Sequence, residues 1–286
     1  MSKFTDALSA FLDGEPYDAI RISVCDKDGK VETLERTELA YCQNTYSVAK
    51  FFTMTAIGLL YDKGLVKPED KICDILKDEI TYDIPDKSWY SVTVDHALTH
   101  SAGLPGGFLD IDVHNSTEFT TDFLRYMLMT QLEYEPGTES RYSDGAFYLL
   151  ARVAEKLSGM PMDDFLWKEL FVKLGFREAA WSHCPMGHAM GATGFYANSA
   201  DMVKLGYVYL NGGMYRGRRI LSEEWINLAT EKEYGCGWDN GRECFSKGGM
   251  NGQTITMVPS TKTAFMIQSY GADCGRISRF ILDYKE

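Results

Sequence analysis

The chain has 286 residues, 45% of them hydrophobic and 24% charged, which excludes a disordered protein and allows one large core or two smaller ones. A net charge of -12 disfavours contact with nucleic acid and with anionic lipid, so neither is an expected partner. No run of about 18 apolar residues occurs, and the first residues do not have the pattern of a secretory signal, so we expect no membrane span and a cytoplasmic protein.

The first third of the chain mixes helix and strand patterns. An amphipathic pattern predicts a short helix over 3–13, and alternation rich in Ile and Val predicts a strand over 17–25. The sequence Asp26-Lys27-Asp28-Gly29 is typical of a hairpin turn, so residues 30–35 are expected to return as a second strand. Residues 47–63 are predicted to form a helix.

The middle of the chain has helical periodicity almost throughout. Five helices are predicted between about 68 and 180, over 68–77, 93–99, 117–130, 144–158 and 161–173. The last third mixes the two patterns again. It contains predicted helices over 199–210, from Ser222 onward and over about 274–284, and predicted strands over 243–248, 253–258 and 263–269.

This order of elements indicates an α+β fold. Strands at both ends of the chain can form one antiparallel sheet flanked by helices, with an all-helical lobe inserted between them. We expect residues 1–67 and 190–286 to build the sheet lobe and residues 68–189 to build the helical lobe, with an active site in the cleft between the lobes.

The sequence gives little support to a metal site or an organic cofactor. Seven cysteines without paired spacing favour reduced thiols, which agrees with a cytoplasmic setting. The segment 183–188 holds His, Cys and His in a loop rich in Pro and Gly, but it lacks a fourth ligand, so an ordinary loop is favoured over zinc. His96 and His100 are expected to pack or to cap a helix rather than to bind metal.

Ser47-Val48-Ala49-Lys50 is the one S-x-x-K in the chain, at the start of a predicted helix. A spacing of three places both side chains on one helical face, where Lys50 could take the proton of Ser47 if its environment lowers its basicity. The motif is weak alone, because about one is expected by chance in a chain of this length. The alternative is a serine at a helix start and a solvated lysine.

Two further short motifs follow along the chain. In Tyr142-Ser143-Asp144 the phenol could share the role of general base with Lys50, although Tyr142 could also be a core residue and Asp144 a helix cap. In Lys247-Gly248-Gly249 the lysine lies on a predicted strand, and the two glycines would let a substrate approach the backbone.

The order S-x-x-K, Y-x-D, K-x-G resembles the serine β-lactamase and penicillin-binding-protein family, in particular the branch with class C β-lactamases, D,D-peptidases and related esterases. Further similar segments are Asp95 to Pro105, Pro136-Gly137-Thr138 before Tyr142, Leu210 to Tyr215 and Arg219 to Ser222. The resemblance covers about residues 40 to 270 and implies the two-lobed fold described above.

The resemblance also implies a role for each motif residue. It implies that Ser47 is acylated, that Lys50 and Tyr142 move its proton and later activate water, and that Lys247 adds positive charge. The backbone N–H groups of Ser47 and Met250 would form the oxyanion hole. The residues expected to contact the substrate are Asp144, Gly248 and Gly249.

A second tyrosine competes with Tyr142 for its role. Tyr196-Ala197-Asn198 has the wording Y-A-N that class C enzymes use, but it lies in a segment that resembles a later part of the family. Asn198 is there expected to cap the helix that begins at 199. We therefore predict that Tyr142 carries the function.

Two positions depart from the family pattern. Asp144 stands where an Asn is usual, and Gly248 stands where K-T-G has a hydroxyl. Both usual groups recognise penicillin-like amides, so the catalytic residues look complete and the recognition of β-lactams altered. We expect nearby lysines to keep Asp144 ionised by lowering its pKa.

These observations favour a serine hydrolase that acts through an acyl-enzyme on a small ester or amide, with weak β-lactamase activity in addition. Its partner would be a small ester, amide or β-lactam substrate. Two alternatives stay open: a D,D-peptidase acting on peptidoglycan, and a catalytically silent homologue that binds a ligand.

Overall fold

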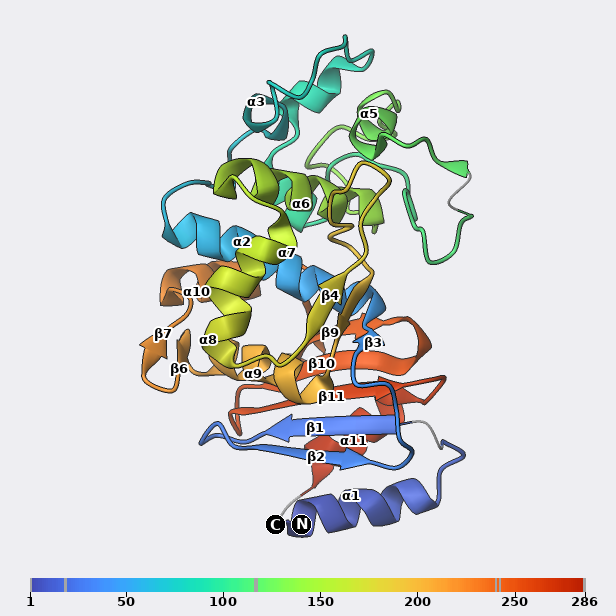
Figure 1. Cartoon of the computed structure of the whole chain (residues 1–286), viewed down its shortest axis with the longest axis vertical. Coiled ribbons are helices and arrows are strands. Elements are labelled where there is room, and N and C mark those ends of the chain that lie inside the picture. Colours follow the sequence, from blue (N-terminus) through green and yellow to red (C-terminus); the bar gives the residue numbers. More distant parts are fainter. Residues whose placement is uncertain (1, 18–19, 116–117, 240, 242, 285–286) are drawn as a thin grey trace.

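The computed structural model describes residues 2–17, 20–115, 118–239, 241 and 243–284. Its main sheet has the strand order β2-β1-β11-β10-β9-β8, and every neighbouring pair is antiparallel. Figure 1 shows that this sheet is assembled from the two ends of the chain. The strands are β1 (Ile20–Cys25), β2 (Val31–Glu35), β8 (Gly237–Asp239), β9 (Cys244–Gly249), β10 (Gln253–Val258) and β11 (Thr263–Ser269).

Helices cover both faces of the sheet, because side chains alternate along the strands. On β11, Phe265 and Ile267 pack with α1 (Lys3–Asp13) and α11 (Cys274–Asp283), which carry their own apolar residues into this layer. Ala264 and Met266 face the opposite way, into the larger core that α9 shares. Helix α9 (Ser199–Leu210) comes very close to the sheet, since a Cβ on its Gly206 would lie 2.9 Å from the Ala264 side chain.

The other end of the molecule is helical and lies far from both chain termini (Figure 1). Helix α2 is buried along nearly its whole length and packs against α6, so these two helices form the centre of the molecule. The remaining α-helices pack around these two helices or against the sheet. The bounds are α2 (Ala49–Asp62), α3 (Ile72–Ile75), α4 (Val94–Leu98), α5 (Phe123–Leu128), α6 (Asp144–Ser158), α7 (Met162–Leu166), α8 (Val172–Leu174) and α10 (Glu223–Glu231).

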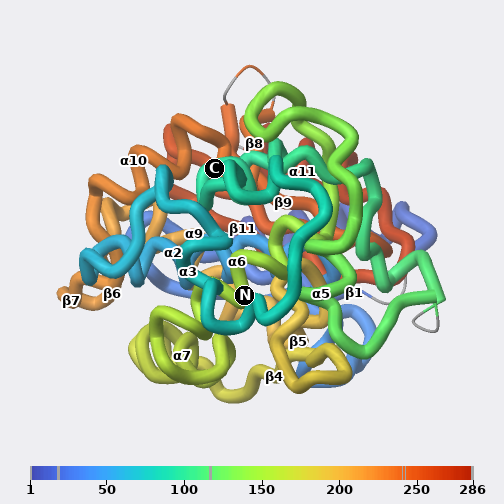
Figure 2. The backbone as a smooth tube through the Cα atoms, turned by 90° about the horizontal axis from the view of Figure 1, so that it is seen from above, coloured from blue at the N-terminus to red at the C-terminus, as the bar shows by residue number. Residues whose placement is uncertain are grey.

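Short elements complete the chain. A three-stranded sheet joins β3 (Gln43–Asn44), β5 (Phe195–Ala197) and β4 (Ala179–Trp181), and a small hairpin joins β6 (Met214–Tyr215) and β7 (Arg218–Arg219). Figure 2 shows β4, β5 and α7 on the opposite side of the molecule from α10 and β8. The short helical turns are η1 (Tyr46–Val48), η2 (Lys87–Ser91), the π-helical η4 (Trp167–Phe171) and η5 (Met250–Gly252).

The predicted α+β fold is confirmed, and most element positions with it. The helix predicted over 68–77 is shorter, because only Ile72–Ile75 is helical. The helix predicted over 117–130 is observed as Phe123–Leu128, and residue 117 lies outside the described residues. The strand predicted from 17 begins at Ile20, with residues 18–19 also outside the described part.

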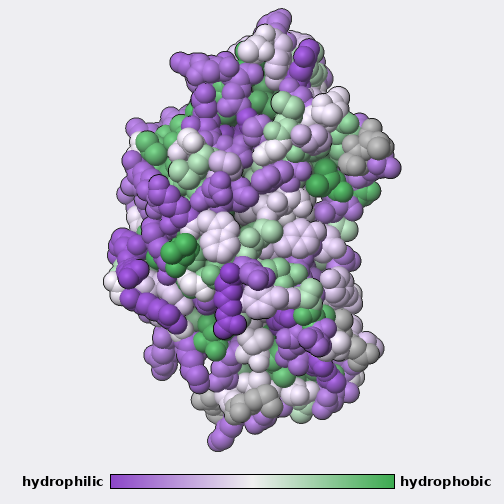
Figure 3. All heavy atoms as spheres, in the orientation of Figure 1, coloured by the Kyte–Doolittle hydropathy of each residue, from purple (hydrophilic) through white to green (hydrophobic). Residues whose placement is uncertain are grey.

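The polarity of the surface and the state of the cysteines agree with what the composition indicated. On the face drawn in Figure 3, hydrophobic side chains form small separate patches among polar ones. None of the seven cysteines forms a disulfide, and five of them are buried, as the uneven count indicated. Among the described residues, no helix combines the length and the apolar character needed to cross a bilayer.

Candidate active site

Ser47 lies in a strained turn between a short strand and the central helix. The turn η1 follows β3 directly, and Tyr46 has a φ of 47°, a left-handed conformation that is uncommon for an aromatic residue. The Asn44 side chain holds this conformation by accepting a hydrogen bond from the Tyr46 N–H at 3.0 Å, and the Thr45 N–H donates to Phe195 O at 2.8 Å. Such strain typically costs about 1–3 kcal/mol and is concentrated at functional sites.

Lys50 occupies the first turn of α2 and is fully buried, with 0% of its side chain exposed. Its Nζ donates to Ser47 Oγ at 3.1 Å, to Asp144 Oδ1 at 2.7 Å and to Ala192 O at 3.0 Å. These three acceptors match the three donors of an ammonium group. The structure therefore excludes the alternative that Lys50 is a solvated surface lysine.

Tyr142 reaches Ser47 from the loop that precedes α6. Its hydroxyl donates to Ser47 Oγ at 2.6 Å, and its ring is 43% exposed. The Nζ atoms of Lys50 and Lys247 each lie 4.7 Å from the centroid of this ring. One phenol thus lies beside Ser47 and within reach of two lysine side chains.

The end of β9 passes directly beside the turn that holds Ser47. A Cβ on Gly249 would lie 2.5 Å from Thr45 O and 3.2 Å from Ser47 N, so only glycine allows this approach. Met250 is the next residue after this close approach. Gly248 is exposed, and a Cβ there would meet no atom within 4 Å. Burial lowers the pKa of Lys247, which Tyr142 opposes.

Asp144 does not have the environment expected from the sequence. Ser143 is the N-cap of α6, and Asp144 is its first residue, 3% exposed, with its carboxylate on Lys50. Burial raises the pKa of Asp144, and Lys50 only opposes this effect. Lys50 and Lys247 do lower this pKa, but the expected net lowering is wrong, because the loss of solvation outweighs both lysines.

Two more carboxylates approach the same pair. Asp110 and Asp112 have oxygens within 4.8 Å of one another and of Asp144, in the loop before α5. Asp112 accepts a hydrogen bond from Thr193, and burial raises its pKa. Of these three carboxylates, Asp144 is the one that forms an ion pair with Lys50 among the described residues.

His100 is a site residue that sequence reasoning missed. Its ring packs between Tyr142 and Phe147, with centroid distances of 4.6 Å and 5.0 Å, and its Nδ1 accepts from the Ser143 N–H at 3.3 Å. Burial lowers the pKa of His100 well below its usual range, and the charges of Lys247 and Lys50 lower it further. The neutral His100 ring therefore packs against Tyr142 without adding a charge. Its neighbour His96 accepts from the Thr93 N–H in a capping box, as one of its predicted roles required.

The competing motif has a structural role. Asn198 caps α9 by accepting from the Ala200 N–H at 2.9 Å, which confirms the predicted cap. Tyr196 lies on β5 opposite Asn44, with 37% of its surface exposed. No hydrogen bond among the described residues joins Tyr196 to Ser47, whereas one joins Tyr142 to Ser47.

The His and Cys residues of segment 183–188 have separate partners. His183 pairs with Asp163 at 3.0 Å and His188 pairs with Glu155 at 2.8 Å. The Cys184 sulfur lies 3.4 Å from the hydroxyl of Tyr148. The sequence favours an ordinary loop here, and each of the three side chains contacts a different partner.

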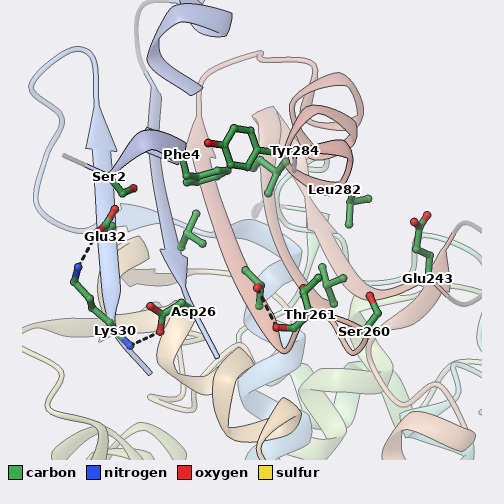
Figure 4. A pocket seen from close by; sticks show the side chains of 14 residues that line it. Ser2, Phe4, Asp26, Lys30, Glu32, Glu243, Ser260, Thr261, Leu282 and Tyr284 are labelled. Carbon is green, nitrogen blue, oxygen red and sulfur yellow. Dashed lines mark hydrogen bonds and ion pairs between the residues drawn. The ribbon is translucent and has the colours of Figure 1, made fainter. Parts of the chain in front are cut away.

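A hollow of about 290 Å³ lies away from Ser47, between α1, α11 and the sheet. Figure 4 shows Phe4 and Tyr284 at one end of it and Asp26, Lys30 and Glu32 along one side. None of the residues implied in catalysis lines this hollow. The candidate active site is therefore the cluster around Ser47.

Comparison with known proteins identifies the family of the chain. Residues 43–273 match the family model described as Beta-lactamase. Penicillin-binding protein 4 of Amycolatopsis lactamdurans is 24% identical over 72% of this chain and 63% of its own length. The chain spans 61% to 67% of the length of the first curated relatives it matches.

Two solved structures have the same fold. A penicillin binding protein from Bacillus halodurans has a TM-score of 0.75 at 17% identity, covering 96% of this chain and 98% of that one. EstCE1, a hydrolase with promiscuous acyltransferase activity, has a TM-score of 0.74 at 16% identity, covering 98% and 97%. Since the family model matches most of the sequence, the chain belongs to the beta-lactamase family.

Proposed function

We propose that this chain is a serine hydrolase that transfers the acyl group of a small ester or amide to Ser47 and then to water. One observation carries the proposal: Ser47 Oγ is within hydrogen-bonding distance of both the Tyr142 hydroxyl, at 2.6 Å, and Lys50 Nζ, at 3.1 Å. A serine is a weak nucleophile until a neighbouring base takes its proton, and this arrangement provides one.

The reaction would proceed in two halves. In the first, the Ser47 oxygen attacks the carbonyl carbon as its proton passes to the base, and the backbone N–H groups of Ser47 and Met250 stabilise the developing oxyanion. The leaving alcohol or amine takes the proton. In the second half, water repeats the attack on the acyl-enzyme and releases the acid. The approach of Gly249 to Ser47 N supports the oxyanion hole, since it brings the two backbone segments together.

Small esters are preferred over β-lactams in this proposal. Gly248 offers no hydroxyl to a substrate carboxylate, and Asp144 offers its carboxylate to Lys50 rather than an amide N–H to the substrate. One of the curated relatives is a penicillin-binding protein, so slow acylation by β-lactams is a second expected property. Hydrolysis of peptides ending in D-alanine is the alternative, and it also requires recognition of a carboxylate.

A fluorophosphonate probe tests the mechanism directly. We expect one adduct per chain by mass spectrometry, mapped to the Ser47 peptide and absent from Ser47→Ala. Hydrolysis of a nitrophenyl ester, a chromogenic cephalosporin and a peptide ending in D-alanyl-D-alanine would then rank the substrates. An adduct on another residue, or turnover that survives in Ser47→Ala, would refute the proposal. A wild-type chain that no electrophile labels would favour a silent ligand-binding homologue.

A further inference from the structure

A second hollow, of about 540 Å³, lies between β2, the start of α9 and the β6–β7 hairpin. Figure 1 shows α8, α9 and this hairpin beside one another at one side of the molecule. We propose that the hollow binds a small anion with two negative charges, a phosphate group or a dicarboxylate, through Arg177 and Arg216. None of the residues implied in catalysis lines this hollow, so the inference goes beyond the proposed function and does not depend on it.

The charges that line the hollow do not cancel. Four cationic side chains and two carboxylates line it, and both carboxylates are already paired. Glu35 accepts from Arg21 at 2.8 Å. Asp201 accepts from Lys204 at 2.7 Å. Two positive charges therefore remain in this one hollow, although the whole chain has a net charge of -12.

Arg177 and Arg216 carry the two remaining charges. Both residues are exposed, and no hydrogen bond or ion pair joins either guanidinium to another described residue; that of Arg216 lies 5.3 Å from the ring centroid of Tyr215. The Arg177 backbone N–H donates to Asp201 at 3.0 Å, which fixes the backbone from which this side chain extends. Burial and Asp201 raise the pKa of Tyr41, and Arg177 lowers it, so the charge of Arg177 acts on a residue that lines the hollow.

The floor of the hollow is held in place before any ligand binds. Arg21 is 3% exposed, and its guanidinium donates to Ala40 O at 3.2 Å and to Tyr41 O at 3.1 Å. Lys204 donates to Gly175 O at 3.0 Å in addition to its ion pair. These two cations are already committed to acceptors of the chain, so an incoming anion has to order only the two exposed arginines.

The charge and size of the hollow indicate the class of ligand. A guanidinium presents its N–H donors in a planar fork that matches two oxygens of a phosphate or a carboxylate, and two such groups neutralise an anion with two charges. Val31 and Leu174 add apolar wall, and Thr33 and Asn198 add polar groups, so an organic anion has contacts for its uncharged part as well. The volume is within the range of roughly 300–1,000 Å³ that is usual for small-molecule sites. Nucleic acid and anionic bilayers are excluded as ligands, because the rest of this acidic surface repels a large polyanion.

The test is titration calorimetry on the whole chain, in a buffer that contains neither phosphate nor carboxylate. Inorganic phosphate and succinate are the two probes, and they distinguish a phosphate-bearing ligand from a dicarboxylate. Sodium chloride at the same ionic strength controls for general screening. Arg177→Gln and Arg216→Gln each remove one guanidinium from an exposed position, so both variants are expected to fold. Arg276→Gln is the matched control, because it removes the same charge from a side chain that is 63% exposed and lies outside the hollow.

We expect saturable binding of one anion per chain, with phosphate, succinate or both, and no such binding with chloride. Arg177→Gln and Arg216→Gln should each raise the Kd at least about 10-fold, because each removes a charge-assisted contact to the anion. Arg276→Gln should leave the Kd within about 2-fold of wild type, since a distant exposed charge is screened. The inference is overturned if neither probe binds saturably at millimolar concentration, if binding survives in both hollow variants, or if Arg276→Gln weakens it equally. Labelling of Ser47 is independent of these results, so a failure here leaves the proposed function standing.

Discussion

The buried ion pair also makes a prediction about stability. Lys50 and Asp144 are almost completely removed from solvent, and each is the other's counter-ion. Removing one member of such a pair typically costs about 3–5 kcal/mol, because a charge is left buried without compensation. Replacing both by apolar residues of similar volume is often nearly neutral, because the cost of desolvating two charges disappears together with their attraction.

We therefore expect a large coupling between Lys50→Met and Asp144→Leu. Asp144→Leu should lower the free energy of unfolding by about 3–5 kcal/mol, since Lys50 is left alone in the interior. Lys50→Met should cost less, because Asp144, whose pKa burial already raises, can bind a proton when the lysine is absent. The double variant should lie within about 2 kcal/mol of wild type.

Urea unfolding of the four proteins, followed by circular dichroism, measures this cycle. The pair Lys87→Met and Asp83→Leu is a matched control, because these side chains form an ion pair at 2.6 Å but are 63% and 86% exposed. Exposed pairs contribute little, so this control cycle should show a coupling below about 1 kcal/mol. If the costs of Lys50→Met and Asp144→Leu add within about 0.5 kcal/mol, the two charges do not depend on each other and the argument fails.

Three further predictions follow from the site. Tyr142→Phe should lower kcat for a nitrophenyl ester about 10²–10⁴-fold, whereas Tyr196→Phe should change it far less, and the reverse order would transfer the role to Tyr196. Gly249→Ala should lower kcat/KM about 100-fold, because the added Cβ displaces the Ser47 turn. Gly248→Ala should lower kcat/KM much less, because its Cβ meets open space. Equal losses in the two variants would contradict the close approach of Gly249 to Ser47. Folding keeps His100 neutral while the unfolded chain binds a proton below about pH 6.5, so stability should fall by up to about 1.4 kcal/mol per pH unit as pH decreases below 6.5. His100→Asn should flatten that slope in urea unfolding, and the exposed His114→Asn should not; an unchanged slope in His100→Asn would exclude His100 as its source.

Local spacing predicted the contact that a helix enforces. Lys50 is three positions after Ser47, and the two side chains meet at 3.1 Å as the S-x-x-K pattern required. The turn that aims the serine was not predictable in the same way. Tyr46 adopts its left-handed conformation because Asn44 and the pairing of Thr45 with Phe195 hold it, and strands of two or three residues have no periodicity to detect.

The sequence alone could not predict the environment of Asp144. Its partner is 94 positions away in the chain, so neither its burial nor its ion pair has a local signal. The prediction of a lowered pKa counted the lysines and omitted the loss of solvent. His100 was missed for a related reason: its place against Tyr142 and Phe147 depends on how the segment after α4 crosses the start of α6.

The burial of Lys50 in α2 costs stability, and folding alone does not explain it. Every residue of α2 from Ala49 to Leu60 is buried, so a methionine or leucine at position 50 would suit the helix better than a charge. Keeping the ammonium there requires Asp144 as a counter-ion and the Ala192 carbonyl as an acceptor. Since a buried pair gives little net stability, these residues are explained by what Lys50 does for Ser47 and Tyr142 rather than by folding. A Lys50→Met/Asp144→Leu protein that is as stable as wild type but inactive is what this explanation requires.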